Sequence, residues 1–190
     1  YDVGANIGYM TLMLANCTGT KGCVFAFEPL PENQERLFRA IELNGLNDRI
    51  AVVKKAAGRT TGRTQFWVHA STSMGRIGPA KDGAGDTQGD NSYQRSIEVE
   101  LVSLDDFIYR ENNPAPDVVK LDIEGGEVEA LPGMRKMLRE HQPLMFVEIH
   151  GTEAGQVVWH ELVEAGYGLY WMLEGYPSVE DAGALQGKAY

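Results

Sequence analysis

The 190-residue sequence predicts an α/β fold in which helices lie on both faces of a mostly parallel sheet. Short apolar, β-branched runs alternate with amphipathic stretches along the chain, and a glycine-rich turn joins the first strand directly to a helix. The length suits a single domain over residues 1–190. The opening residues, Tyr1 to Gly4, resemble the end of a strand, so we expect an N-terminal segment to precede them.

Charge and composition exclude several classes of partner. There are 17 Lys and Arg residues against 27 Asp and Glu residues, a formal net charge of −10, so we expect no nucleic-acid partner. No apolar stretch reaches the roughly 18 residues of a membrane span, so we expect no membrane insertion in this part of the chain. Cys17 and Cys23 alone suggest ordinary thiols in a reducing, cytoplasmic location. The sequence gives no indication of oligomeric state.

The first elements alternate between strand and helix. One strand ends at Val3, and the apolar run over 8–15 predicts a buried helix that stops at the turn over 18–22. A second strand follows over 24–27. The next helix begins at Pro31, because proline is tolerated in a first helical turn, and ends at a glycine, Gly45.

The middle of the chain predicts a third strand and an antiparallel pair. The third strand spans 50–53, and the segments 64–68 and 97–102 alternate in period two, which suits two paired strands. Between them, residues 70–96 are rich in Gly, Ser, Asp and Asn. A loop this long is usually functional or disordered, so we expect a lid there.

The last part returns to alternating elements. A short helix opens at residues 103–106, a near-continuous apolar strand spans 117–123, and a helix over 128–139 is interrupted by a proline–glycine pair. A buried strand over 144–149 and a helix over 157–165 complete the pattern.

The glycine-rich turn carries the first chemical signal. The string DVGANIG, Asp2 to Gly8, lets the backbone turn sharply and approach a ligand closely. Glu28 ends the second strand about 20 residues further on, where a carboxylate can accept the hydroxyl hydrogens of a ribose. Asp2 would repel a pyrophosphate but suits a cationic ligand. S-adenosylmethionine, which joins an ammonium and a sulfonium to an adenosine, fits this combination.

Polar side chains at two strand ends carry the second signal. Asp122 and Glu124 follow one strand, Glu148 and His150 follow another, and carboxyl ends of parallel strands share one sheet edge. We expect His150, as a neutral imidazole, to be the general base, with Asp122 and Glu124 orienting the acceptor or the methionine end of the cofactor. An oxygen-rich set could bind magnesium, but we expect no metal because only the D-x-E spacing is tight.

These strings together resemble the FkbM family of methyltransferases. The resemblance rests on Asp2 to Gly8, AFEPLPENQERL, SLDDF, KLDIEGGEVEAL and FVEIH, in an order that covers the chain to about Tyr170. It implies a Rossmann-like class I methyltransferase fold with a seven-stranded, mostly parallel sheet whose last strand is antiparallel. It also implies S-adenosylmethionine-dependent O-methylation of a hydroxyl on a small molecule or sugar.

The resemblance also implies cofactor-binding residues. The turn of the family falls on Asp2, Gly4, Ala5, Asn6 and Gly8, and its ribose-binding acid falls on Glu28. Related enzymes often present an Asn or Asp to the adenine after the third strand. This sequence has Lys55-Ala56-Ala57 there, so we expect backbone contacts near Ala56.

Two other functions fit a similar fold. One is an NAD(P)-dependent oxidoreductase, which Asp2 and the absence of a third glycine in the turn disfavour. The other is a non-catalytic Rossmann-like binding module, which the polar groups at Asp122, Glu124, Glu148 and His150 disfavour.

Overall fold

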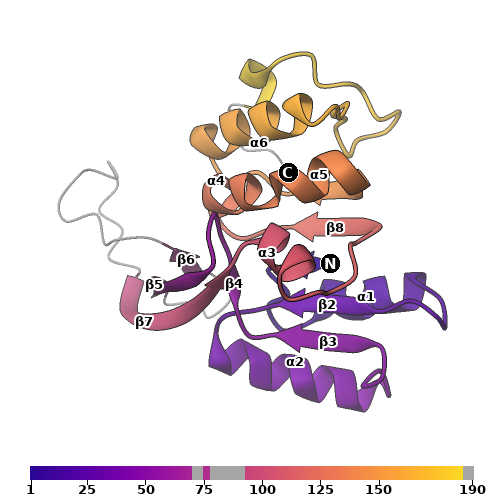
Figure 1. The fold of residues 1–190 in the computed structure, drawn as a ribbon, viewed down its shortest axis with the longest axis vertical. Helices are drawn as coiled ribbons and strands as arrows, with labels where there is room; N and C mark the ends of the chain where they lie inside the picture. Colours follow the sequence, from indigo (N-terminus) through magenta and orange to yellow (C-terminus); the bar gives the residue numbers. More distant parts are fainter. Residues whose placement is uncertain (70–74, 78–92, 186–190) are drawn as a thin grey trace. The chain divides into compact units, whose positions relative to one another are not determined.

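Figure 1 presents the computed structural model, which describes residues 1–69, 75–77 and 93–185. The chain forms two compact units. The first comprises Tyr1–Ala56 and Gly62–Leu101, and the second comprises Ala57–Thr61 and Val102–Tyr190. No helix in the described part of the chain is long and apolar enough to cross a membrane.

The first unit contains three parallel strands. β2 (Val24–Phe27) pairs in parallel with both β1 (Asp2–Val3) and β3 (Ile50–Val53). α1 (Tyr9–Cys17) connects β1 to β2, and α2 (Pro31–Leu43) connects β2 to β3 (Figure 1). The predicted order of these five elements is confirmed.

One apolar cluster joins both helices to these strands. Ala15 of α1 and Leu37 and Ile41 of α2 are buried together with residues of β2 and β3. The prediction of a buried helix over 8–15 is wrong for one face of α1, because Tyr9 is 79% exposed and Met13 is 45% exposed. The helix buries one face, at Thr11 and Ala15, and leaves the opposite face in solvent.

An antiparallel group completes the first unit. β5 (Gly62–His69) pairs with β7 (Tyr93–Val102) and with β6 (Gly75–Ile77), so the predicted pairing of 64–68 with 97–102 is confirmed. The predicted loop over 70–96 therefore contains β6 and the start of β7. Its other residues, and with them the predicted lid, lie outside the described residues. The short strand β4 (Ala56–Ala57) was not predicted, because two residues show no periodicity.

The second unit pairs two parallel strands with several helices. β8 (Val118–Leu121) runs parallel to β9 (Leu144–Val147). α3 (Leu104–Tyr109) begins where predicted, and the Ser103 hydroxyl accepts a hydrogen bond from the Asp106 N–H at 3.1 Å. The remaining helices are α4 (Glu127–Ala130), η1 (Leu131–Met134), α5 (Arg135–His141), α6 (Thr152–Glu164) and η2 (Ala182–Leu185).

The interrupted helix is confirmed and has a steric reason. Between α4 and α5 the chain forms a 3-10 turn, in which a Cβ on Gly133 would lie 2.0 Å from the carbonyl oxygen of Gly58. Only glycine permits this close approach.

One prediction about a strand in the second unit is wrong. β9 is not buried, because Leu144 and Phe146 are exposed and β9 pairs with no described strand other than β8. β1, β2 and β3 in the first unit and β8 and β9 in the second are the parallel strands of the described residues, in agreement with the mostly parallel α/β class that was predicted. After α6 the described chain forms an isolated antiparallel bridge between Tyr170 and Ser178, in a largely exposed segment, and then η2.

An ion pair in the second unit should make stability depend on pH. Arg135 donates from Nε to Oε2 of Glu161 at 2.6 Å, and Nη2 donates to Oε1. These hydrogen bonds lower the pKa of Glu161 below its ordinary value of 4.5. The pair therefore stabilises the fold above that value, and its contribution is lost as the pH falls through the lowered pKa.

Glu161→Gln is accordingly expected to reduce the free energy of unfolding by about 1 kcal/mol at pH 7, discounted because Arg135 is half-exposed. Urea denaturation at several pH values checks this, and the difference from wild type should shrink below pH 4.5. Glu98→Gln, in the exposed Arg63–Glu98 pair, is the control and should change little. A pH-independent loss in Glu161→Gln would contradict the electrostatic origin.

Candidate functional site

The turn after β1 is held in a conformation that favours glycine. Gly4, Asn6 and Gly8 have φ values of 85°, 51° and 97°. The N–H groups of Gly4 and Ala5 both donate to the carbonyl oxygen of Phe27, at 3.1 and 3.0 Å. The turn is thereby fastened to the end of β2.

Gly8 allows α1 to begin close to α2. A Cβ at this position would lie 2.6 Å from Cδ1 of Leu37, which is fully buried. With its positive φ, this contact gives Gly8 a packing role in addition to any role in ligand binding.

Asp2 is fully buried, and its Oδ2 accepts a hydrogen bond from the Thr11 hydroxyl at 2.5 Å. This bond ties β1 to α1. Asp2 thus has a structural role in the ligand-free chain, and its contact with a cofactor stays a prediction.

Glu28 is buried at the end of β2 and connects three segments. Its Oε2 accepts from the Asn6 N–H at 2.8 Å, and its Oε1 accepts from the Leu30 N–H at 2.9 Å and from the Asn33 side-chain amide at 3.3 Å. Burial raises the pKa of Glu28, and these hydrogen bonds oppose the rise. A carboxylate oxygen accepts about two hydrogen bonds, so Oε2, with one donor in place, keeps capacity for a ribose hydroxyl.

Ala56 has surroundings of a different kind. It lies in β4 and is buried with Leu30, Phe66, Val68 and Val99. Its methyl group belongs to the apolar core, so only its backbone is suited to contact a ligand.

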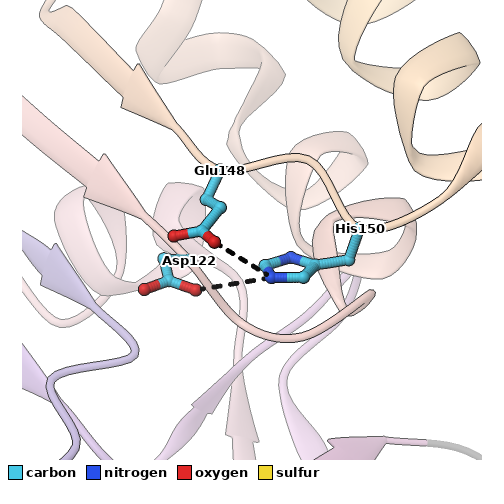
Figure 2. Close-up of side chains that lie close together, drawn as sticks. All are labelled: Asp122, Glu148 and His150. Atoms are coloured by element: carbon cyan, nitrogen blue, oxygen red, sulfur yellow. Dashed lines mark ion pairs between the residues drawn. The ribbon is translucent and has the colours of Figure 1, made fainter. Parts of the chain in front are cut away.

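In the second unit, the ends of β8 and β9 bring polar side chains together. Asp122 follows β8 directly, and Glu148 and His150 follow β9. Figure 2 shows their carboxylates and imidazole pointing toward one another. His150 Nε2 lies 3.9 Å from Asp122 Oδ1 and 3.6 Å from Glu148 Oε1. The predicted convergence of the two strand ends is therefore confirmed within this unit.

Glu124 joins this group from a strained turn. Its Oε2 lies 3.6 Å from His150 Nε2. The backbone of Glu124 has a φ of 54°, which non-glycine residues rarely adopt, and Gly125 follows with a φ of 90°. Burial raises the pKa of Glu124, while the nearby His150 lowers it. Left-handed non-glycine residues of this kind are enriched at functional sites.

Glu127 was not among the predicted site residues, yet it has the shortest contact with His150. It is fully buried at the start of α4, and its Oε1 lies 3.1 Å from His150 Nδ1 and accepts from the Ile123 N–H at 3.2 Å. An acid in a first helical turn is ordinarily interpreted as a partner of the helix dipole. Its position directly after two glycines was the available signal.

The neighbouring carboxylates affect the protonation of His150. The hydrogen bond to Glu127 raises the pKa of His150 to about 9, against the opposing effect of burial, and the charges of Glu127, Glu124 and Asp122 add to the rise. Such a pKa favours a protonated imidazole at neutral pH in the ligand-free chain, in contrast to the neutral imidazole expected from the sequence. The role of His150 as the general base stays a prediction.

Lys120 pairs with Asp122, through Nζ and Oδ2 at 3.2 Å. Oδ1 of Asp122 faces His150 instead. Ligand atoms of Asp122, Glu148 and His150 all lie within 4.8 Å of one another, so these three residues are the described set that could hold a metal ion.

Comparison with known proteins identifies relatives of the chain. Residues 2–169 match the family model described as the methyltransferase FkbM domain. The hexuronic acid methyltransferase AglP of Haloferax volcanii is 31% identical over 150 residues, which are 79% of this chain and 55% of that protein. A crystal structure of methyltransferase FkbM from Methylobacillus flagellatus KT matches with a TM-score of 0.53 and 26% identity, over 77% of this chain and 31% of that one.

The chain thus spans about half the length of the curated relative and about a third of the solved one. The structural match confirms the predicted Rossmann-like α/β class. The family match covers both the glycine turn and the two strand ends of the second unit. The chain therefore belongs to the FkbM family of methyltransferases.

Proposed function

We propose that the chain is the catalytic part of an S-adenosylmethionine-dependent O-methyltransferase that acts on a hydroxyl of a sugar or another small molecule. The observation that carries the proposal is the buried Glu28 carboxylate, tied by the Asn6 N–H to the glycine turn. A strand-end acid beside a turn with positive φ angles fits the ribose of an adenosine ligand.

In this proposal the first unit binds the methyl donor. Glu28 accepts hydrogen bonds from the ribose, Asp2 contributes negative charge, and Gly4, Ala5, Asn6 and Gly8 provide a backbone that a ligand can approach. The backbone near Ala56 is the candidate for adenine contact. When bound, S-adenosylmethionine supplies a methyl group on a positively charged sulfur, which is a good leaving group.

The second unit acts on the acceptor. We propose that His150, Asp122 and Glu124 bind and orient the acceptor hydroxyl, since alignment of the reacting groups can supply much of the acceleration. With the donor bound, the acceptor oxygen would bond to the methyl carbon as the carbon–sulfur bond breaks, and the hydroxyl proton would pass to the imidazole of His150 or to a carboxylate beside it. S-adenosylhomocysteine and a methyl ether are the products.

A sugar is the favoured acceptor class. The relative from Haloferax volcanii carries the name hexuronic acid methyltransferase, and 79% of this chain aligns with it. We further propose a cytoplasmic location, because Cys17 and Cys23 are exposed free thiols that fit a reducing compartment.

Ligand-dependent stabilisation tests the donor assignment. Thermal shifts should be observed with S-adenosylmethionine and S-adenosylhomocysteine but not with NAD or NADP, and a ligand at 100 times its Kd stabilises by about 2.7 kcal/mol. Stabilisation by NAD or NADP alone would favour the oxidoreductase. Transfer of one methyl group to a hexuronic acid-containing oligosaccharide, followed by mass spectrometry, then tests the acceptor class and would exclude a non-catalytic module.

A further inference from the structure

Three side chains at the ends of β8 and β9, those of Asp122, Glu148 and His150, have the residue types and spacing of a metal site. We propose that Asp122, Glu148 and His150 bind a divalent first-row transition metal ion. This departs from the absence of a metal expected from the sequence. Binding of the ion does not depend on the proposed function, whereas its role in activating an acceptor hydroxyl rests on that function.

The distances around His150 Nε2 leave room for an ion. Nε2 lies 3.9 Å from Asp122 Oδ1 and 3.6 Å from Glu148 Oε1, beyond the roughly 2.7–3.2 Å of a direct hydrogen bond. Two ligands bonded to one ion at about 2.1 Å lie at most about 4.2 Å apart. Both contacts of Nε2 fall within that limit, so an ion can bridge these atoms with small side-chain movements (Figure 2).

Glu127 provides an independent indication of a ligand. This carboxylate is fully buried, its Oε1 holds His150 Nδ1 at 3.1 Å, and its Oε2 is buried without a hydrogen-bond partner among the described residues. A buried polar atom without a partner calls for an explanation, and an ion bound nearby is one such explanation. Metal-binding histidines usually donate their second N–H to a carboxylate, which directs the other nitrogen to the ion. Here Glu127 is the carboxylate that holds Nδ1, and Nε2 is the nitrogen left for the ion.

Charge and ligand type define the class of ion. The imidazole is surrounded by four carboxylates, those of Asp122, Glu124, Glu127 and Glu148. Lys120 pairs with Oδ2 of Asp122, the oxygen that does not face His150. The local excess of negative charge suits a divalent cation. One imidazole nitrogen with two carboxylate oxygens favours ions such as Mn²⁺ or Zn²⁺ over Ca²⁺, which prefers oxygen ligands throughout.

Such an ion would give the proposed reaction a way to activate the acceptor hydroxyl. A divalent cation lowers the pKa of a hydroxyl that binds to it and orients the oxygen. Asp122, Glu148 and His150 would then hold the ion, and the acceptor hydroxyl would bind to the same ion.

The test is direct metal binding, measured without methyl donor or acceptor. The purified protein is stripped with EDTA and titrated with Mn²⁺, followed by the electron paramagnetic resonance signal of free Mn²⁺, and with Zn²⁺ by calorimetry. We expect one ion per chain. Asp122→Asn and Glu148→Gln should weaken binding at least tenfold, and Glu127→Gln should weaken it about 10–100-fold.

Glu129→Gln is the matched control. Glu129 lies on the same helix as Glu127 but pairs at the surface with Arg59, so its substitution should leave metal affinity unchanged. Circular dichroism of each variant verifies folding. Wild-type affinity no higher than that of Asp122→Asn and Glu148→Gln, or an equal loss in Glu129→Gln, would overturn the proposal.

The two proposals fail in different ways. Methyl transfer that continues at full rate in EDTA, with no metal bound to the wild type, would leave the methyltransferase assignment intact and refute the metal site. Metal binding with the expected variant pattern, but no affinity for S-adenosylmethionine, would support the metal site and refute the methyl-donor assignment.

Discussion

Replacing His150 with alanine is expected to lower kcat by about 10²–10⁴-fold and to leave the affinity for S-adenosylmethionine nearly unchanged. The imidazole is the centre of the group in the second unit, with three carboxylate oxygens around Nε2 and Glu127 on Nδ1. Its removal takes away the group that we propose acts on the acceptor proton, directly or through a bound ion, and leaves the residues of the glycine turn unchanged. Steady-state kinetics and calorimetry measure the two quantities separately.

His160→Ala is the control for this experiment. His160 is exposed on α6, and its ring lies 3.9 Å from the exposed Glu164, so its loss should not affect turnover. A decrease of less than about threefold in His150→Ala would mean that alignment of the substrates carries the reaction. Loss of cofactor binding would instead assign His150 to the donor site.

Replacing Glu28 with alanine should have the largest effect on donor binding. The variant removes the charged acceptor of the proposed ribose contact, which corresponds to about 1–3 kcal/mol, or about 5–150-fold in Kd. Titration calorimetry with S-adenosylhomocysteine measures this without turnover. Unchanged affinity would refute the role of Glu28.

Glu28 also holds the turn, so two further variants separate binding from structure. Glu28→Gln keeps the shape and one acceptor oxygen and should weaken binding less than alanine does. Asn33→Ala removes one hydrogen bond to Glu28 Oε1 while leaving the carboxylate in place. If Asn33→Ala weakened binding as much as Glu28→Ala, the contribution of Glu28 would be to the local structure alone.

Much of the fold was predictable because local signals agreed with the tertiary structure. Pro31 begins α2, and β2 and β3 have the predicted bounds, since a proline and short apolar runs act through neighbouring residues. The exposure of β9 was not predictable, because it depends on which strands pair with it. β4, with two residues, is defined only by its partners.

The candidate site also has features that the sequence predicts and features that it does not. The convergence of Asp122, Glu148 and His150 followed from strand parity and the shared edge of parallel strands. Glu127 and the raised pKa of His150 did not, because both depend on how the turn through Glu124 and Gly125 folds back toward the imidazole. Sequence spacing specifies which strand ends carry polar groups but not which atoms touch.

The contact between Gly8 and Leu37 has a consequence for engineering. Because the position of a missing methyl group is filled by a core leucine of α2, the shape of the turn is determined partly by the packing of a helix some 30 residues away in sequence. Redesign of that helix for thermostability would alter the turn as well, so screening at position 37 should score ligand retention together with melting temperature. For the same reason, directed evolution toward larger donor analogues can vary Leu37 of α2 and leave every residue of the turn unchanged.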